Sequence, residues 1–376
     1  MDRLVISCGG TGGHFLPGLS IAREFQQRGG TALLLLGGKN ARKQMETAEK
    51  HHISSLIFPA SYPSKNPIRL FRFFLQFAAG WLKCRNAVRK FKPDALLAMG
   101  SFASLAPVFA AKSGKIPVFL HDGNTKLGKA NIFLSRYARA VALSFPTGNA
   151  EKAKCPVIQT GFPLRQELVD GKRSKADAIR ELNELYGSDL SPELPTVLIF
   201  GGSLGAESIN RNLVISGDPV ETRGIQFLRL TGRGKLEPLA GLYDRQNCKV
   251  LALESSQRMD LFYSAADLVI SRSGGSTVSE IAVFGKYAVL LPYPHAADNH
   301  QETNAEWLVS AGGAEILHDS DASPEWFTSW IINWLNRKDE YAEKGKKSLT
   351  IARPDAARRV IDMIDNITSV KTGEQR

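Results

Sequence analysis

Glycines gather at two places where a short apolar run gives way to a helix-like pattern. The first place, residues 9–14, reads Gly-Gly-Thr-Gly-Gly-His and follows the apolar run 4–8. Glycine leaves the backbone without Cβ atoms, so amide N–H groups at a helix start are able to close around an anion. A tight turn without a ligand is the simpler alternative, and the glycines do not spell the G-x-G-x-x-G dinucleotide fingerprint. The loop therefore favours a phosphate-bearing ligand without identifying it.

The second place is residues 271–282, which follow the apolar run 268–270. Here Gly275, Ser276 and Thr277 would open a helix, whose positive end suits a diphosphate. Glu280 follows about one turn later and could accept hydrogen bonds from two ribose hydroxyls. In the alternative interpretation Ser276 or Thr277 is an N-cap and Glu280 its capping-box partner. A further glycine-rich strand end, Gly201-Gly202-Ser203, favours a nucleotide.

Imidazoles and amides follow the predicted strand 288–291, at residues 295–305. Doubly wound sheets bind ligands at the carboxyl ends of their strands, where such groups suit sugar hydroxyls. A metal site at His295 and His300 is the competing interpretation, less favoured because no cysteine or carboxylate pair accompanies them. No Asp-x-Asp is recognised at a strand end, where it could bind a divalent ion. We therefore expect chemistry without a metal and without a cofactor.

The composition limits the class of protein. A chain of 376 residues is long for one core and predicts two domains. The net charge of +11 indicates an acidic partner: nucleic acid, anionic lipid or a phosphorylated substrate. Nucleic acid is the least favoured, because basic residues cluster with apolar ones in one helix. The four cysteines form no C-x-x-C pair, which excludes an evident zinc site and fits a reducing cytoplasm.

Apolar runs alternate with helical patterns along the whole chain, which indicates βαβ units and parallel sheets. Neither a signal peptide nor an apolar run of about 18 residues is present, so we expect no secretion and no membrane span. The pattern predicts an α/β protein with two Rossmann-like halves joined near residue 164 and a helix over 354–370. The predicted strands are 4–7, 31–36, 56–58, 95–98, 118–120, 141–143 and 157–160, then 196–200, 225–230, 249–253, 268–270 and 288–291.

One predicted helix, residues 67–83, carries more apolar surface than a sheet needs to cover. Its apolar side chains spread over roughly 200° of arc, whereas about 100° suffices for packing. Basic residues follow it, and no acidic residue stands between Asn66 and Lys92. This pattern favours contact with anionic lipid headgroups, while burial by a neighbouring domain or subunit is the alternative. The residues expected at the membrane are Leu70, Phe71, Phe74, Phe77 and Trp81.

Six motifs together resemble the MurG family, GT-B enzymes of glycosyltransferase family 28, over nearly the whole chain. They are 9–14, His121-Asp122-Gly123-Asn124, 161–165, 201–206, 271–280 and 300–305. The resemblance implies transfer of N-acetylglucosamine from UDP-GlcNAc to the C4 hydroxyl of MurNAc in undecaprenyl-pyrophosphoryl-MurNAc-pentapeptide (lipid I), giving lipid II of peptidoglycan. It also implies two Rossmann-like domains facing across a cleft, 1–163 for acceptor and membrane and 164–351 for UDP-sugar, with a helix at 352–370 that packs back on the first.

The resemblance assigns roles residue by residue. His14 is the first candidate for the base and Asp122 the second. The acceptor would contact Gly10, Thr11, Gly12, Gly13, Phe102, His121 and Asn124. The donor would contact Arg165, Ser203, Ser256, Gly275, Ser276, Thr277, Glu280, His300, Gln301 and Asn304. The expected location is the cytoplasmic face of the inner membrane, peripherally bound, with cell-wall synthesis and division proteins as further partners.

This chain departs from the family pattern mainly in the acceptor half. His121-Asp122-Gly123-Asn124 stands where the family has His-Glu-Gln-Asn, and Phe102 stands where it has tyrosine. These differences keep two alternatives open: another GT-B glycolipid transferase, and a catalytically weak scaffold that binds UDP-sugar or lipid.

Overall fold

The computed structural model describes residues 1–10, 12–61, 66–202, 205–217, 220–222, 224–236, 248–296 and 299–373. The candidate residues Thr11 and Ser203 lie outside the described residues. The chain forms two compact units, the first from 1–165 and 353–376 and the second from 166–352. Arg165, expected at the start of the second domain, is the last residue of the first segment of unit 1.

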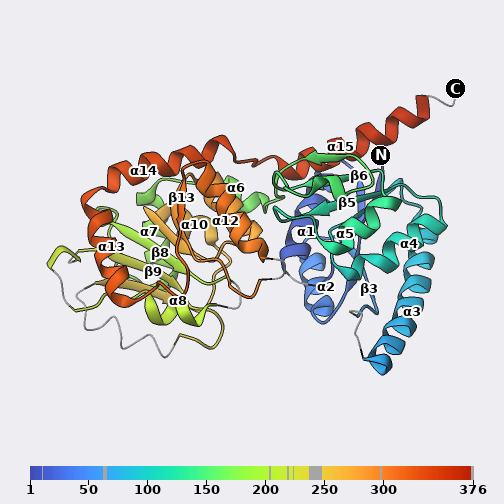
Figure 1. Ribbon diagram of the computed structural model, residues 1–376. Helices are drawn as coiled ribbons and strands as arrows, with labels where there is room; N and C mark the ends of the chain where they lie inside the picture. Colours follow the sequence, from blue (N-terminus) through green and yellow to red (C-terminus); the bar gives the residue numbers. More distant parts are fainter. Residues whose placement is uncertain are drawn as a thin grey trace. The chain divides into compact units, whose positions relative to one another are not determined.

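The described residues of unit 1 form a parallel sheet in the order β3-β2-β1-β4-β5-β6-β7 (Figure 1). Its strands are β1 Arg3–Ser7, β2 Thr31–Gly37, β3 Ser54–Phe58, β4 Ala95–Ala98, β5 Val118–Asp122, β6 Ala140–Leu143 and β7 Val157–Gln159. Its helices are α1 Gly12–Gln27, α2 Ala41–Lys50, α3 Pro67–Phe91, α4 Leu105–Ser113, α5 Lys129–Leu134 and α15 Ala356–Gly373.

Helices cover both faces of this sheet because each strand is apolar on both sides. Leu4 and Ile6 of β1 pack in one core with Ile21 of α1, while Val5 packs in another core with Val108 of α4. Helix α15 completes the first core with Val360, Ile361 and Ile364, and its Asp362 pairs with Arg28 of unit 1 at 2.7 Å.

The described residues of unit 2 form a parallel sheet in the order β10-β9-β8-β11-β12-β13 (Figure 1). Its strands are β8 Thr196–Phe200, β9 Gln226–Leu230, β10 Lys249–Leu253, β11 Leu268–Ser271, β12 Tyr287–Leu290 and β13 Ala314–Ile316. Its helices are α6 Gln166–Asp170, α7 Lys175–Tyr186, α8 Glu207–Asn212, α10 Met259–Ala265, α11 Gly275–Phe284, α12 His300–Ser310, α13 Pro324–Asn336 and α14 Lys338–Lys346. The prediction of an α/β protein with two parallel-sheet, Rossmann-like domains is confirmed, although β13 was not predicted.

Helix α3 packs one side against the sheet and leaves apolar side chains exposed on the other. Phe77 and Trp81, both expected at the membrane, instead pack against the core that contains Phe58 and Cys84. The large exposed apolar residues of the helix are Ile68, Phe71, Phe74, Leu75 and Leu82. Leu70 is half-buried. In the part of the chain that the structure describes, no helix has the length and apolar character needed to cross a membrane.

Candidate active site

The first glycine turn joins β1 to α1, as the sequence predicted. Gly10 has a φ of +105°, a conformation that L side chains rarely adopt. Its carbonyl accepts hydrogen bonds from Asn40 Nδ2 and Gln44 Nε2, both at 3.2 Å. A Cβ added at Gly12 would meet no atom within 4 Å, so the first turn of α1 is open at this point. This open turn is the positive end of α1.

Two imidazoles lie together beside this turn. A Cβ at Gly100, which follows β4, would lie 3.5 Å from His14 Cδ2 and 3.6 Å from the His121 carbonyl. His121 is fully buried, and its Nε2 lies 3.2 Å from Ser144 Oγ. Burial, together with the nearby His14, lowers the pKa of His121 to about 3. Burial also lowers the pKa of His14 below its ordinary value.

Asp122, the second candidate for the base, is occupied by structural hydrogen bonds. Its Oδ2 accepts from Gly128 N at 2.8 Å and Asn131 Nδ2 at 2.9 Å, and its Oδ1 accepts from Asn124 N at 3.2 Å. These hydrogen bonds tie together the loop that follows β5. They also leave the carboxylate few lone pairs with which to accept a proton from a substrate. The geometry favours His14 as the base.

The remaining acceptor candidates lie near the same strand ends. Asn124 is half-buried in the loop that Asp122 closes, and Phe102 is half-buried just beyond Gly100. Arg165, which was expected to contact the donor, is half-buried at the end of the first segment of this unit. Unit 1 thus brings His14, His121, Asp122 and Asn124 to the carboxyl ends of its central strands.

The second glycine turn joins β11 to α11 in unit 2. Gly274 is the N-cap of α11, and among the described residues no side chain caps it. The capping-box alternative for Ser276, Thr277 and Glu280 is therefore wrong. The first amides of α11 are left for a ligand, as in a helix-terminal anion site.

Glu280 is held by a tyrosine. The hydroxyl of Tyr263, in α10, donates to Glu280 Oε2 at 2.8 Å. Tyr263 is fully buried and stacks on Phe284, with 5.0 Å between ring centroids. This bond fixes one carboxylate oxygen of Glu280 and thereby orients the other.

Gln301 and Asn304 are tied to the loop after β11. Ser273 Oγ donates to the Gln301 carbonyl at 2.7 Å, and Asn304 Nδ2 donates to the Ser273 carbonyl at 3.2 Å. Gln301 Oε1 accepts from Tyr293 N at 3.0 Å. Asn304 is fully buried and so supports the loop, whereas Gln301 and His300 are half-buried in the first turn of α12.

Strand β13 exposes an error in the sequence analysis. An Asp-x-Asp, Asp319-Ser320-Asp321, follows shortly after this unpredicted strand. Both oxygens of Asp319 accept from the guanidinium of Arg272, at 2.6 and 2.8 Å. Among the described residues, no three His, Cys, Asp or Glu side chains are grouped as for a metal ion.

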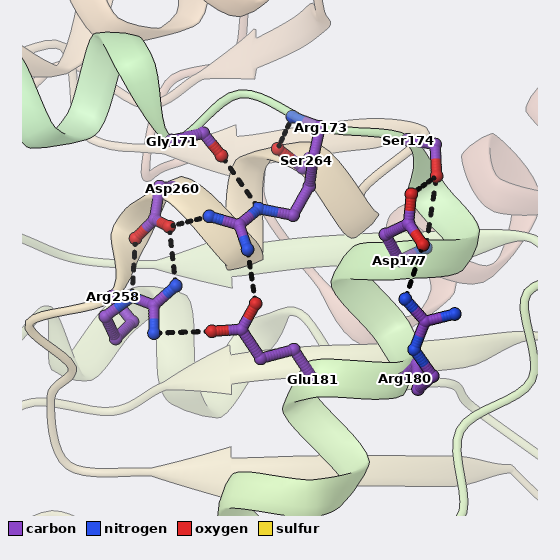
Figure 2. Close-up of polar contacts among 9 residues, drawn as sticks. All are labelled: Gly171, Arg173, Ser174, Asp177, Arg180, Glu181, Arg258, Asp260 and Ser264. Atoms are coloured by element: carbon purple, nitrogen blue, oxygen red, sulfur yellow. Dashed lines mark hydrogen bonds and ion pairs between the residues drawn. The ribbon is translucent and has the colours of Figure 1, made fainter.

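Ser256 contacts a residue of an ion-pair network, and Figure 2 shows part of this network. Its Oγ accepts from Arg258 N at 3.0 Å and lies 3.0 Å from the Tyr186 hydroxyl. The Arg258 guanidinium pairs with Asp260 at 3.0 Å and with Glu181 at 2.6 Å, and Arg173 pairs with the same two carboxylates (Figure 2). The loop after β10 is thereby held to α7 and α10.

Sequence reasoning missed Tyr263, Tyr186 and Arg258 because each acts through a contact between separate elements. Only Arg258 gave a local signal, since it stands two residues after Ser256 and two before Asp260.

Known proteins match the chain along both units. Residues 4–143 match the glycosyltransferase family 28 N-terminal domain, and residues 196–360 match the glycosyltransferase family 28 C-terminal domain. A UDP-N-acetylglucosamine–N-acetylmuramyl-(pentapeptide) pyrophosphoryl-undecaprenol N-acetylglucosamine transferase from Mesorhizobium japonicum is 32% identical over 374 residues, 98% of this chain and 96% of that protein. A relative of the same name from Thermodesulfovibrio yellowstonii is 30% identical, over 97% of this chain and 98% of its own.

Solved structures give the same result. MurG of Acinetobacter baumannii superposes with a TM-score of 0.75 at 26% identity, covering 97% of this chain and all of that one. The UDP-GlcNAc 2-epimerase of Neisseria meningitidis, bound to UDP-GlcNAc, has a TM-score of 0.65 at 13% identity over 99% of this chain and 100% of its own, and so shares the fold alone.

Proposed function

Since this chain belongs to the MurG family of glycosyltransferase family 28, we propose that it transfers N-acetylglucosamine from UDP-GlcNAc to lipid I, giving lipid II. The observation that carries this proposal is the match of 32% identity over 98% of the chain, which includes both units. The names of these relatives specify both the donor and the acceptor.

Unit 2 is proposed to bind the donor. The amides of Gly275, Ser276 and Thr277 hold the diphosphate at the open start of α11, and Glu280 accepts from the ribose hydroxyls. The backbone at Ser256 reads the uracil ring, with the Tyr186 and Arg258 contacts keeping it in place. Gln301 binds the sugar hydroxyls with support from His300 and Asn304. Ser203, which lies outside the described residues, stays a predicted contact of the donor.

Unit 1 is proposed to bind the acceptor. The loop Gly10 to Gly13, including Thr11, would receive the lipid pyrophosphate at the start of α1. His121, Phe102 and Asn124 shape the surroundings of His14. Asp122 acts as a positioning residue, because its oxygens already accept backbone and amide hydrogen bonds.

The proposed reaction is a single displacement with inversion. His14 takes the proton of the MurNAc C4 hydroxyl, and this oxygen forms a bond to the anomeric carbon of the donor. The bond from that carbon to the diphosphate oxygen breaks, and its electron pair leaves with UDP. The lowered pKa of His14 keeps the imidazole neutral and ready to accept a proton near pH 7. The helix amides of Gly275 to Thr277 stabilise the charge that develops on UDP.

Peripheral contact with an anionic membrane surface is proposed for α3. Phe71 and Phe74 are 64% and 57% exposed, with Ile68 and Leu75 beside them. Basic residues end the helix, among them Arg89 and Lys90. We propose the cytoplasmic face of the inner membrane as its location, with cell-wall and division proteins as neighbours; the exposed apolar side chains and the basic end of α3 support this proposal.

Two measurements test the proposal. Turnover with UDP-GlcNAc and lipid I should occur, whereas turnover with diacylglycerol should not. UDP-GlcNAc should raise Tm more than UDP-glucose or UDP-galactose at equal concentration, since the ligand that binds more tightly stabilises the fold more. Binding of UDP-GlcNAc without turnover of lipid I would overturn the activity and support the scaffold alternative.

The membrane proposal is tested separately by sedimentation with vesicles that contain anionic phospholipid. The double variant Phe71→Ser and Phe74→Ser should bind them much less than the unaltered protein. The matched control is Leu185→Ser, which removes an equally exposed apolar side chain, 51% exposed, from unit 2. Equal loss with the control would contradict the role of α3.

A further inference from the structure

A cavity of about 500 Å³ opens on unit 2, away from the loops assigned to the donor. It is lined by residues that immediately precede three neighbouring strands: Pro195 before β8, Asp267 before β11 and Lys286 before β12. The donor candidates stand at the opposite, carboxyl ends of these strands. Since strands of this length span about 15 Å, the cavity is separate from the proposed donor site.

Lysines dominate the lining of this cavity. Five lysines line it against three carboxylates, which gives an excess of two positive charges: Lys172, Lys175, Lys286, Lys338 and Lys346 against Glu193, Asp267 and Asp339. Lys338 and Lys346 come from the first and last turns of α14. The excess is local and lies in a concave surface, where charge attracts an ion of opposite sign most strongly.

One of the lysines pairs with a carboxylate of the lining, and two others donate to backbone carbonyls. Lys175 Nζ lies 2.5 Å from Asp267 Oδ2, an oxygen that also accepts from Thr196 N at 2.8 Å. Lys286 Nζ donates to the Ala266 carbonyl at 2.7 Å, and Lys172 Nζ donates to the Val283 carbonyl at 3.2 Å. Burial, with repulsion by Lys172 and Lys175, lowers the pKa of Lys286 to about 8. Asp267 alone therefore does not neutralise the cluster.

The lining also has an apolar part. The Phe284 ring lies under Lys172, with 6.0 Å from Nζ to the ring centroid, and Leu349 and Ala342 line the same space. Several ammonium donors suit an anion with three or more acceptor oxygens, as a phosphate has. The volume exceeds that of phosphate alone and is within the range of small-molecule sites.

We propose that this lysine cavity is a second anion site, which binds a small phosphorylated molecule at the edge of unit 2 opposite to the donor loops. The phosphate contacts Lys172, Lys286 and Lys338, and the rest of the molecule lies against Phe284 and Leu349.

The test is the rate at which an acetylating reagent modifies each lysine, read by mass spectrometry, with inorganic pyrophosphate as the probe. Saturating UDP is present throughout, so that the proposed donor site is filled. At pyrophosphate about ten times above its dissociation constant, Lys172 and Lys286 should react about tenfold more slowly. Lys344, which pairs with Glu340 on the same helix and does not line the cavity, should keep its rate.

Variants of exposed residues separate binding from folding. Lys338→Gln with Lys346→Gln should abolish the protection of Lys286 while leaving Tm and UDP affinity unchanged, and Lys344→Gln should leave the protection intact. Sodium chloride of equal ionic strength replaces pyrophosphate as the screening control. The proposal is overturned if Lys344 is slowed as much as Lys286, if pyrophosphate gives no protection in the presence of saturating UDP, or if the double variant retains the protection.

Discussion

From the hydrogen bond between Tyr263 and Glu280 we predict how much nucleotide affinity depends on the Tyr263 hydroxyl. The change Tyr263→Phe removes one hydroxyl from a fully buried ring that stays stacked on Phe284. Without the 2.8 Å bond, the Glu280 carboxylate loses a contact that fixes its rotamer before the ligand arrives. Fixing a side chain on binding costs about 0.5–1.5 kcal/mol, so UDP should bind about fivefold more weakly.

Calorimetric titration with two nucleotides checks the cause of this loss. If Glu280 reads the ribose, the variant should lose affinity for UDP and lose almost none for 2′,3′-dideoxy-UDP, which lacks the hydroxyls. Tyr341→Phe, the same deletion in another buried tyrosine of unit 2, is the matched control and should leave both affinities unchanged. Equal losses for both nucleotides would refute the reasoning, because they would show a general disturbance of the fold.

Further predictions concern unit 1 and the phosphate charge. His14→Ala should lower kcat by about 10²–10⁴, with little change in UDP affinity, and near-normal kcat would exclude His14 as the base. Because burial lowers the pKa of His14, the acidic limb of kcat against pH should lie below pH 6.5. In the folded protein His121 has a pKa of about 3 and is neutral. In the unfolded chain it takes up a proton below about pH 6.5, so the free energy of unfolding should decrease as the pH is lowered below that value. His121 should account for about 2 kcal/mol of the loss in unfolding free energy between pH 7 and pH 5, and urea unfolding of His121→Gln should lack this share. Turnover should persist in EDTA, and its loss would contradict charge stabilisation by the α11 amides.

The parallel sheets could be predicted from the sequence because their signal is local. Runs such as 196–200 are apolar on both faces, and they alternate with helical patterns. This combination is typical of a parallel sheet that is covered by helices on both sides. Strand β13 escaped prediction since it has three residues, one of them Glu315, and relies on pairing with β12. The Asp-x-Asp behind it was overlooked for the same reason.

The orientation of side chains depended on packing and could not be predicted. The apolar arc of α3 is wide enough that Phe71 and Phe77 were equivalent in sequence. In the structure, Phe77 lies against Phe109 of α4, while Phe71 remains exposed. Tyr263 and Glu280 are 17 positions apart on separate helices, so no spacing rule connects them. Asp122 was a reasonable candidate by residue type alone, and only its accepted hydrogen bonds show why it is a poor base.

The surroundings of the two glycine turns argue for different ligands, although the turns are alike in sequence and both open a helix after a strand. Near α1 stand two imidazoles, His14 and His121, whose lowered pKa values leave them neutral near pH 7. Near α11 stands Glu280, fixed by Tyr263 in a position to accept hydrogen bonds. A ribose needs an acceptor of this kind, whereas an attacking hydroxyl needs a neutral base. The amides can hold a phosphate in either place, so in the proposed function the neighbouring side chains decide which phosphate each turn receives: the nucleotide at α11, and the acceptor beside His14 at α1.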